Sequence, residues 1–166
     1  MLKITEDFIR QVSDKAKASP RKRANYNFHK IDSELLQRML NAAEPGTYIQ
    51  PHKHEDPDKT EVFIILKGSV VVIEFDEDGN IIDHFVLDAA LRMGMAVEIP
   101  PRKWHSFIAL KPGSVLYEVK DGPYDRDADK KFAAWAPAES SRSAALEFNE
   151  KVLAKLNIKT FKEARA

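Results

Sequence analysis

Short apolar runs separated by turn-forming residues fill the middle of the chain, from Leu35 to Lys120. The runs read LLQRMLNAA, TYIQPHKH, VFIILKG, SVVVIEF, IIDHFVL, AVEIP, WHSFIAL and SVLYEVK, and EPG, DEDG and KPG stand between several of them. Runs this short and this rich in Val, Ile and Phe predict β-strands, and a series of them predicts an all-β sandwich or barrel. Within FDEDGN, Asp78-Gly79 predicts the tip of a hairpin.

Both ends of the chain show helical spacing instead. Over residues 4–17 apolar side chains, among them Val12 and Ala16, recur at the spacing of one helix face, and Thr5 is suited to cap the N-terminus. Residues 142–156 predict a second helix with a serine cap. We therefore expect three parts: an N-terminal helical arm over 1–33, a β-barrel over 34–121, and a C-terminal loop and helix over 122–166 that pack on the barrel.

Composition and charge narrow the class of protein. A chain of 166 residues with 43% hydrophobic content suffices for one globular domain with its own core. The 26 basic and 26 acidic residues balance, so no domain-wide basic surface for nucleic acid is indicated. No run approaches the roughly 18 apolar residues of a membrane helix, and the charged start MLKITEDFIRQ does not resemble a secretory signal. We expect a cytoplasmic protein without nucleic-acid or membrane partners.

Candidate metal ligands can come only from nitrogen and oxygen, because the chain has no cysteine. Side chains of a strand alternate between its two faces, so Tyr48, Gln50, His52 and His54 of TYIQPHKH are expected to share one face. A polar set of this kind suits a barrel interior that holds a ligand better than it suits a dry core.

Two further strands offer ligands. Glu61 opens the strand VFIILKG on the face of Phe63, and His105 shares a face of WHSFIAL with Phe107. Three imidazoles and one carboxylate suit Zn, Fe(II), Mn, Ni, Co or Cu. The sequence thus predicts one divalent transition-metal ion, whose identity it does not specify, bound by His52, His54, Glu61 and His105. The alternative is a polar pocket wall that binds no metal.

The spacing of these residues resembles the two motifs of the cupin family. The first motif is Gly, five residues, His-x-His, three or four residues, Glu, six residues and Gly. The corresponding residues here are Gly46, TYIQP, His52-Lys53-His54, then Glu61, VFIILK and Gly68. For the second motif they are Gly94, MAVEI, Pro100 and His105. The resemblance implies a double-stranded β-helix, which is a jelly-roll-like barrel, with the metal inside it.

The chain departs from these motifs in three places. Six residues separate His54 from Glu61, so Glu61 is the ligand that the spacing supports least, and Glu55 is a rival carboxylate. Arg102 stands where the second motif has Gly, and Ala109 where it has Asn. Both of these positions are structural in the family, so the metal prediction does not depend on them.

A narrower resemblance extends over most of the chain, from about Phe8 to Glu139. The segments RANYNFHK, AEPGTYIQPHKH, IPPRKWHSF, YEVKDGPYD and WAPAE are similar to those of the WbuC-type cupin metalloproteins. Members of that group are associated with bacterial O-antigen and aminosugar gene clusters. The resemblance therefore implies a fold, a metal and a link to polysaccharide biosynthesis, without naming a substrate.

Candidate catalytic residues are Glu118, Lys120 and Tyr48. Glu118 and Lys120 share one face of the strand SVLYEVK. They form either a solvent-exposed surface pair or an acid–base or anion-binding pair inside the barrel. His29 is a further candidate for the mouth of the site, whereas His84 is expected to face solvent. The basic run RKR at 21–23 is either a solvated linker or an anion contact.

Three functions remain open. The first is a metal-dependent enzyme, such as an isomerase or epimerase, that acts on a small polar molecule such as a sugar or sugar-nucleotide derivative. The second is a non-catalytic metal-binding or small-molecule-binding cupin, and the third is a cupin dioxygenase. The strand VFIILKG is apolar on both faces, so Val62, Ile64 and Leu66 require a cover from the terminal helices or a second subunit. Because cupins commonly pair through their sheets, we predict a homodimer.

Overall fold

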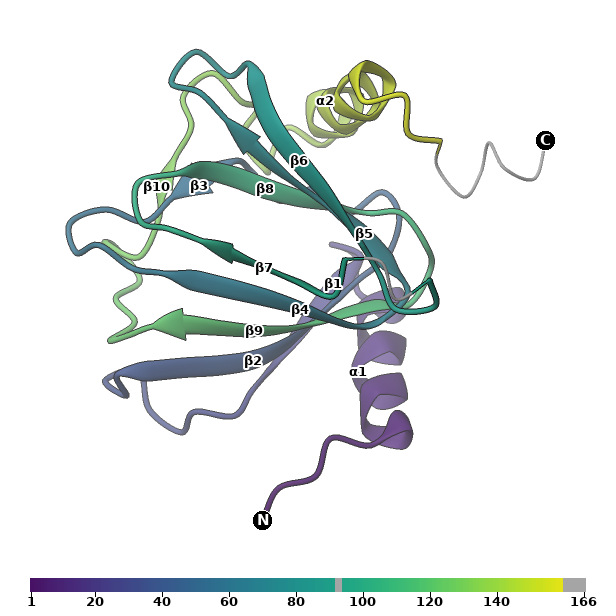
Figure 1. Ribbon diagram of the computed structural model, residues 1–166, viewed down its shortest axis with the longest axis vertical. Helices are drawn as coiled ribbons and strands as arrows, with labels where there is room; N and C mark the ends of the chain where they lie inside the picture. Colours follow the sequence, from purple (N-terminus) through teal and green to yellow (C-terminus); the bar gives the residue numbers. More distant parts are fainter. Residues whose placement is uncertain (92–93, 160–166) are drawn as a thin grey trace.

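Two five-stranded antiparallel sheets face each other in the computed structural model, which describes residues 1–91 and 94–159 (Figure 1). The first sheet has the strand order β1-β2-β9-β4-β7 and the second has the order β10-β3-β8-β5-β6. The first sheet consists of β1 (Arg23–Asn27), β2 (Leu36–Ala43), β9 (Ser114–Asp121), β4 (Glu61–Lys67) and β7 (Ala96–Ile99). The second consists of β10 (Lys131–Phe132), β3 (His52–Lys53), β8 (Trp104–Ala109), β5 (Ser69–Phe75) and β6 (Ile81–Asp88). The described residues add two helices, α1 (Glu6–Ala18) and α2 (Arg142–Lys155), so the predicted all-β class is confirmed.

Apolar side chains fill one half of the space between the sheets. Phe63 and Ile65 of β4 meet Phe107 of β8 and Leu116 of β9, and all four are at most 5% exposed. For β4 and β8 these are the inward faces that strand alternation predicted, whereas for β9 the sequence left open which face lies inside. Burying a side chain of this size contributes about 1.5–3 kcal/mol, so this half of the interior stabilises the barrel.

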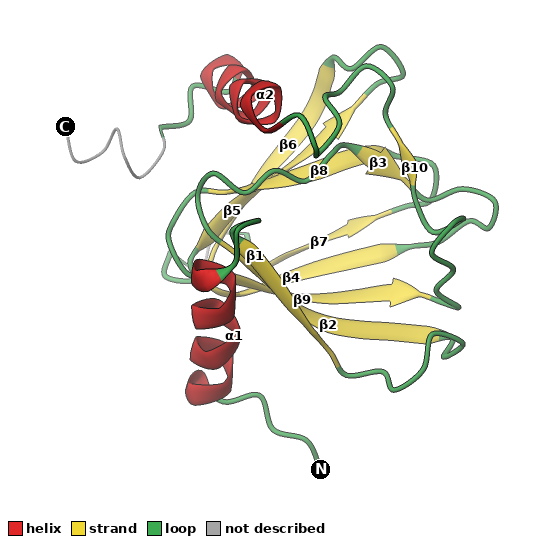
Figure 2. Cartoon of the chain, turned by 180° about the vertical axis from the view of Figure 1, so that it is seen from behind, coloured by secondary structure: helices red, strands yellow, loops and turns green. Residues whose placement is uncertain are grey.

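The helices cover the outer faces of the two sheets, one helix on each (Figure 2). The hydroxyl of Thr5 accepts a hydrogen bond from the Phe8 backbone N–H at 3.3 Å, which confirms the predicted cap. Val12 of α1 packs on the first sheet, and Leu66 lies partly buried against that same cluster. Helix α2 places Val152 against the second sheet. Ser141 stands at the start of α2, but its side chain makes no capping hydrogen bond.

Strand pairing extends into both segments that the sequence assigns to arms. Strand β1, within 1–33, pairs antiparallel with β2, and β10, within 122–166, pairs with β3. Residues 160–166 of the latter segment lie outside the described residues. At the predicted hairpin, Gly79 has φ +82° and the Asp76 N–H donates to the Asn80 carbonyl at 2.9 Å. No described helix has both the length and the apolar character needed to cross a membrane.

Candidate metal centre and cavity

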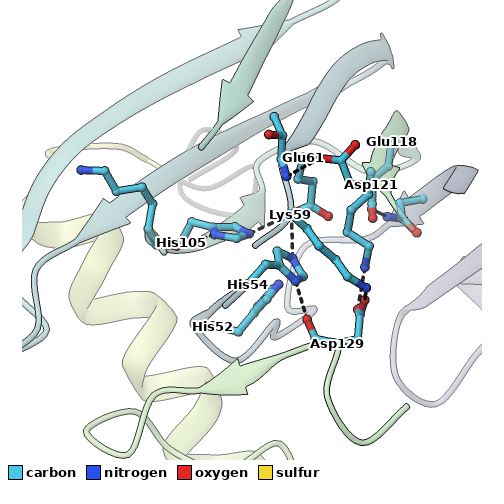
Figure 3. A network of polar contacts seen from close by, with 12 residues as sticks. His52, His54, Lys59, Glu61, His105, Glu118, Asp121 and Asp129 are labelled. Atoms are coloured by element: carbon cyan, nitrogen blue, oxygen red, sulfur yellow. Dashed lines mark hydrogen bonds and ion pairs between the residues drawn. The ribbon is translucent and has the colours of Figure 1, made fainter. Parts of the chain in front are cut away.

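Four side chains from three strands meet between the sheets. His52 lies on β3, His54 follows directly, Glu61 begins β4 and His105 lies on β8. One potential ligand atom from each lies within 4.8 Å of every other, and the four residues are 1–3% exposed. His52 and His105 are direct partners in the β3–β8 pairing, while Glu61 reaches the group from the opposite sheet. The structure thus brings together the four predicted ligands (Figure 3).

Backbone carbonyls fix the tautomer of each histidine. The Nδ1 of His52 lies 3.0 Å from the carbonyl oxygen of Gln50, and the Nδ1 of His105 lies 2.9 Å from that of Lys103. His54 makes the same contact with the carbonyl oxygen of Asp129. A carbonyl can only accept, so each Nδ1 must donate, and an uncharged ring then keeps its lone pair on Nε2. Second contacts of this kind are typical of metal-binding histidines.

Two of the three Nε2 atoms lack a hydrogen-bond partner among the described residues, and the third meets a carboxylate oxygen. Those of His52 and His54 are buried and have no hydrogen-bond partner among the described residues. The Nε2 of His105 lies 2.8 Å from Oε2 of Glu61, a contact that requires either a proton or a cation between two acceptors. Burial lowers the pKa of His52 well below its usual value, which holds this ring in the neutral form. The group therefore fits a divalent metal ion.

A second carboxyl group stands beside Glu61. Burial raises the pKa of Glu118 well above its usual range, and the neighbouring charge of Glu61 raises it further. Burial also raises the pKa of Glu61, but contacts with His105 and His54 outweigh this, and the net pKa is well below the usual range. One carboxyl group of the pair therefore holds a proton and the other is ionised. Asn41 donates a side-chain hydrogen bond to Glu118.

Glu118 and Lys120 point into the barrel. Their residues on β9 pair with Phe63 and Glu61 of β4, and they are 5% and 3% exposed. The alternative of an exposed surface pair is therefore wrong. Both side chains line the cavity next to the four-ligand group. Their catalytic role stays a prediction.

Asp129, in the segment after β9, joins this network without having been predicted. Its carboxylate accepts hydrogen bonds from Lys59 at 2.8 Å and from Lys120 at 2.6 Å, and all three side chains are at most 4% exposed. Burial raises the pKa of Asp129, but the ammonium groups of Lys120 and Lys59 lower it by more. Its carbonyl also accepts from His54, so one residue links the loop over the barrel to a candidate metal ligand.

A cavity of about 440 Å³ adjoins the centre. Its wall includes His52, Glu61 and His105, and also His29, for which a place at the mouth of the site was one open interpretation. A volume in this range is typical of small-molecule sites. Lys130 also faces this space. Like Asp129, it lies in a turn-rich segment of the sequence, where no strand pattern predicts the orientation of a side chain.

The structure does not bring Tyr48 into the cavity. Its hydroxyl donates to the Pro137 carbonyl at 2.7 Å and its ring packs edge-on against Phe148 of α2. The expected alternation fails because β3 spans only His52–Lys53, so Tyr48 lies outside a regular strand. The rival carboxylate Glu55 is also excluded from the centre, since it is held by Lys131 at 2.5 Å and Lys53 at 3.2 Å.

Solved structures with the same architecture come from several bacteria. The capsular polysaccharide assembling protein CapF of Staphylococcus aureus matches with a TM-score of 0.55 and 21% identity over 65% of this chain, which covers only 28% of CapF. The TT1209 protein of Thermus thermophilus matches with a TM-score of 0.50 and 23% identity, over 72% of this chain and 97% of that one. A cupin superfamily protein of Desulfitobacterium hafniense DCB-2 has a TM-score of 0.46 and 13% identity, over 60% of this chain and 76% of its own. No curated protein matches the chain.

The two facing antiparallel sheets, with a buried His52/His54/Glu61/His105 group between them, define an all-β cupin fold with a centre that could bind a metal ion. The chain belongs to the family described as "Domain of unknown function (DUF6016)", whose model matches residues 4–87.

Proposed function

We propose that the protein is a metal-dependent cupin enzyme acting on a small polar molecule, a sugar or sugar-nucleotide derivative of polysaccharide metabolism. One divalent transition metal, of the group Zn, Fe, Mn, Ni and Co, would be held by His52, His54, Glu61 and His105. The observation that carries the proposal is the convergence of three buried Nε2 atoms and one carboxylate beside a cavity of about 440 Å³. A cavity at the ligands gives a small molecule access that a closed structural site lacks.

The chain's own groups suit proton transfer next to that centre. A bound divalent ion would supply electrophilic polarisation of a substrate oxygen. Glu118 would hold the proton to be donated, with Asn41 orienting its carboxyl group. Lys120, buried and tied to Asp129, would position the substrate or stabilise negative charge beside it. The reaction class that fits these groups is an isomerisation or epimerisation.

Support for a sugar-related substrate comes from two directions. The solved structure of CapF is described as a capsular polysaccharide assembling protein, although its likeness to this chain concerns the fold. The segments YEVKDGPYD and WAPAE resemble the WbuC-type cupins, which are associated with O-antigen gene clusters. Both point to the same area of metabolism, so a sugar derivative is the substrate class to test first.

Metal content is the direct test. Protein purified without a histidine tag or chelator is expected to contain about one equivalent of Fe, Mn, Ni, Co or Zn per chain by elemental analysis. The Glu61→Ala variant should lose metal, whereas Glu55→Ala, the neighbouring carboxylate held by Lys131 and Lys53, should keep it. A wild-type protein that contains no metal and takes none up on reconstitution would contradict the proposal. Iron as the bound ion would favour the dioxygenase alternative, and zinc would exclude it.

We also propose a homodimer. Val62 and Ile64 on the outer face of β4 are only partly buried within one chain, while α1 already covers Leu66. A second copy would bury the remainder of that face. Light scattering should then give twice the chain mass of 18.9 kDa, and a mass near 18.9 kDa would contradict the dimer.

A further inference from the structure

Lys130 lines the cavity near the carboxyl groups of Glu61, Glu118 and Asp129 but forms an ion pair with none of them. Its side chain lines the cavity and lies close enough to His52 that its charge, after burial, contributes to lowering the pKa of that ring. Among residues 1–91 and 94–159, no carboxylate forms an ion pair with its ammonium group and no side chain or carbonyl accepts its hydrogen bond. A charge held partly away from water in this way lowers stability unless something pairs with it.

Three neighbouring lysines, in contrast to Lys130, each form an ion pair with a carboxylate. Lys59 and Lys120 both donate to the Asp129 carboxylate, at 2.8 Å and 2.6 Å. Lys131, the next residue in the chain, turns outward and pairs with Glu55 at 2.5 Å. Lys130 alone of these four points into the cavity with its ammonium group free of protein acceptors among the described residues.

Charge around the cavity favours an anionic ligand once the centre holds its metal. With every carboxyl group counted as ionised, the cavity wall holds equal numbers of carboxylates (Asp32, Glu61, Glu118 and Asp129) and cationic side chains (Arg21, Arg23, Lys120 and Lys130). The histidine ligands are neutral in their metal-binding form, so the two charges of a divalent ion remain as an excess. An acidic group of a ligand placed between the ion and Lys130 would offset that excess and give the ammonium group its acceptor.

The rim of the cavity offers a different chemistry. Asn25 and Asn27 of β1 line it, and their amides are hydrogen-bonded to each other at 2.8 Å with further donors and acceptors free to turn toward a ligand. Amides at this position suit hydroxyl groups. Arg21 and Arg23 also line this part of the cavity, where both pair with Glu139, so the amides of Asn25 and Asn27 lie beside arginines whose charge is offset.

We propose that this cavity binds an anionic sugar derivative, with its carboxylate or phosphate group between the metal centre and Lys130 and its hydroxyl groups toward Asn25 and Asn27. This rests on the proposed function and narrows its substrate class from any small polar molecule to an acidic one. Lys130 is then a binding residue that the sequence did not indicate.

Isothermal titration of the full chain tests the site with three probes: D-glucuronate for the carboxylate, D-glucose 6-phosphate for the phosphate, and methyl glucoside as the neutral sugar. The variant is Lys130→Met, and the matched control is Lys131→Met, which removes an adjacent lysine whose ammonium group pairs outside the cavity. The wild type and the control should bind at least one anionic probe about tenfold or more tightly than the variant does. Methyl glucoside should bind all three proteins equally. The probe with the larger loss identifies the acidic group.

Elemental analysis of the same three samples separates this proposal from the one on which it rests, because both variants keep all four ligands. Wild-type protein that cannot be loaded with metal refutes the metalloenzyme. Full metal content with no anion bound more tightly than the neutral sugar, or with no loss in Lys130→Met, refutes the anion site.

Thermal unfolding without ligand provides an independent check. If Lys130 serves a ligand, replacing its unpaired ammonium group by an apolar side chain should leave the midpoint unchanged or raise it. A fall of more than about 4 °C would assign the residue to the fold and contradict the proposal.

Discussion

The two halves of the barrel interior differ although the same strands build both. On β4 the inward face begins with Glu61 and continues with Phe63, and on β8 it begins with His105 and continues with Phe107. Strand β9 runs antiparallel to β4, so its inward face has Leu116 in the apolar half and Glu118 in the polar half. The interior therefore changes from a polar centre to a dry core within two residues on each strand.

The apolar half of the interior stabilises the fold, and the polar half holds the candidate site. The apolar half gains free energy from burial, whereas the polar half holds charges and unpaired acceptors away from water. Sites of this kind are expected to cost stability that a core elsewhere offsets. The dry half also holds the strands rigidly enough to aim the ligands of the other half. Variants in the two halves should consequently fail in different assays.

The largest effect is expected from the dry half. Leu116→Ala removes a side chain that is 1% exposed and should lower the free energy of unfolding by about 2–5 kcal/mol, because it leaves a cavity in the core. Chemical denaturation measures this loss, and metal content should stay at the wild-type level. Leu35→Ala, at a position that is 76% exposed, serves as the control and should change little. Equal losses in both variants would mean that the core is misplaced.

Substitutions of the candidate metal ligands should instead reduce metal binding and leave stability nearly unchanged. His52→Ala and His105→Ala should each lower metal affinity by more than the roughly 100-fold that losing an outer hydrogen-bond partner can cost, with little loss of unfolding free energy in the metal-free protein. Elemental analysis after dialysis and denaturation in chelator measure the two quantities. His84→Ala, whose side chain is exposed on β6, should retain the metal. If both ligand variants keep wild-type occupancy, the centre is wrongly assigned.

The contribution of Asp129 to the stability of the fold is expected to depend on pH. Its net pKa is lowered, so its contribution to stability is fully present above the pKa of the unfolded chain, about 3.9, and is lost as the pH falls through the lower folded pKa. Asp129→Asn should lower unfolding free energy by about 1.5–3 kcal/mol at pH 7 and by less below pH 4. Denaturation curves between pH 3 and pH 7 measure this, with the exposed Asp127→Asn as control. A loss that does not vary with pH would show that the carboxylate charge is not responsible.

The smallest effect is expected at Tyr48. Tyr48→Phe removes one hydrogen bond to Pro137, which is worth about 1 kcal/mol. Metal content and ligand affinity should match the wild type, because the hydroxyl faces away from the cavity. An altered turnover with unchanged stability would restore Tyr48 to the catalytic candidates.

The positions of side chains could be predicted from the sequence for the strands but not for the loops. Strand alternation and motif spacing placed His52, His54 and His105 together, because a side chain's face follows from its position in a regular strand. The same rule left Glu118 open, since alternation defines two faces without saying which one is inside.

Loop residues have no regular alternation of side-chain direction, which is why three cavity and network residues were not predicted. Lys59, Asp129 and Lys130 lie in turn-rich segments, and only the folded chain shows that these segments meet over the barrel. Tyr48 was misplaced for the related reason that the strand was assumed to begin before His52.

The contact between His54 and the carbonyl of Asp129 joins two residues that are 75 positions apart in the chain. Asp129 leaves the ribosome after all four ligands and after the last strand of the first sheet, β9, has been made. A nascent chain that ends before it has the ligands but lacks the carbonyl that selects the tautomer of His54. The contact that orients the His54 ring is therefore completed only after residue 129 has been synthesised.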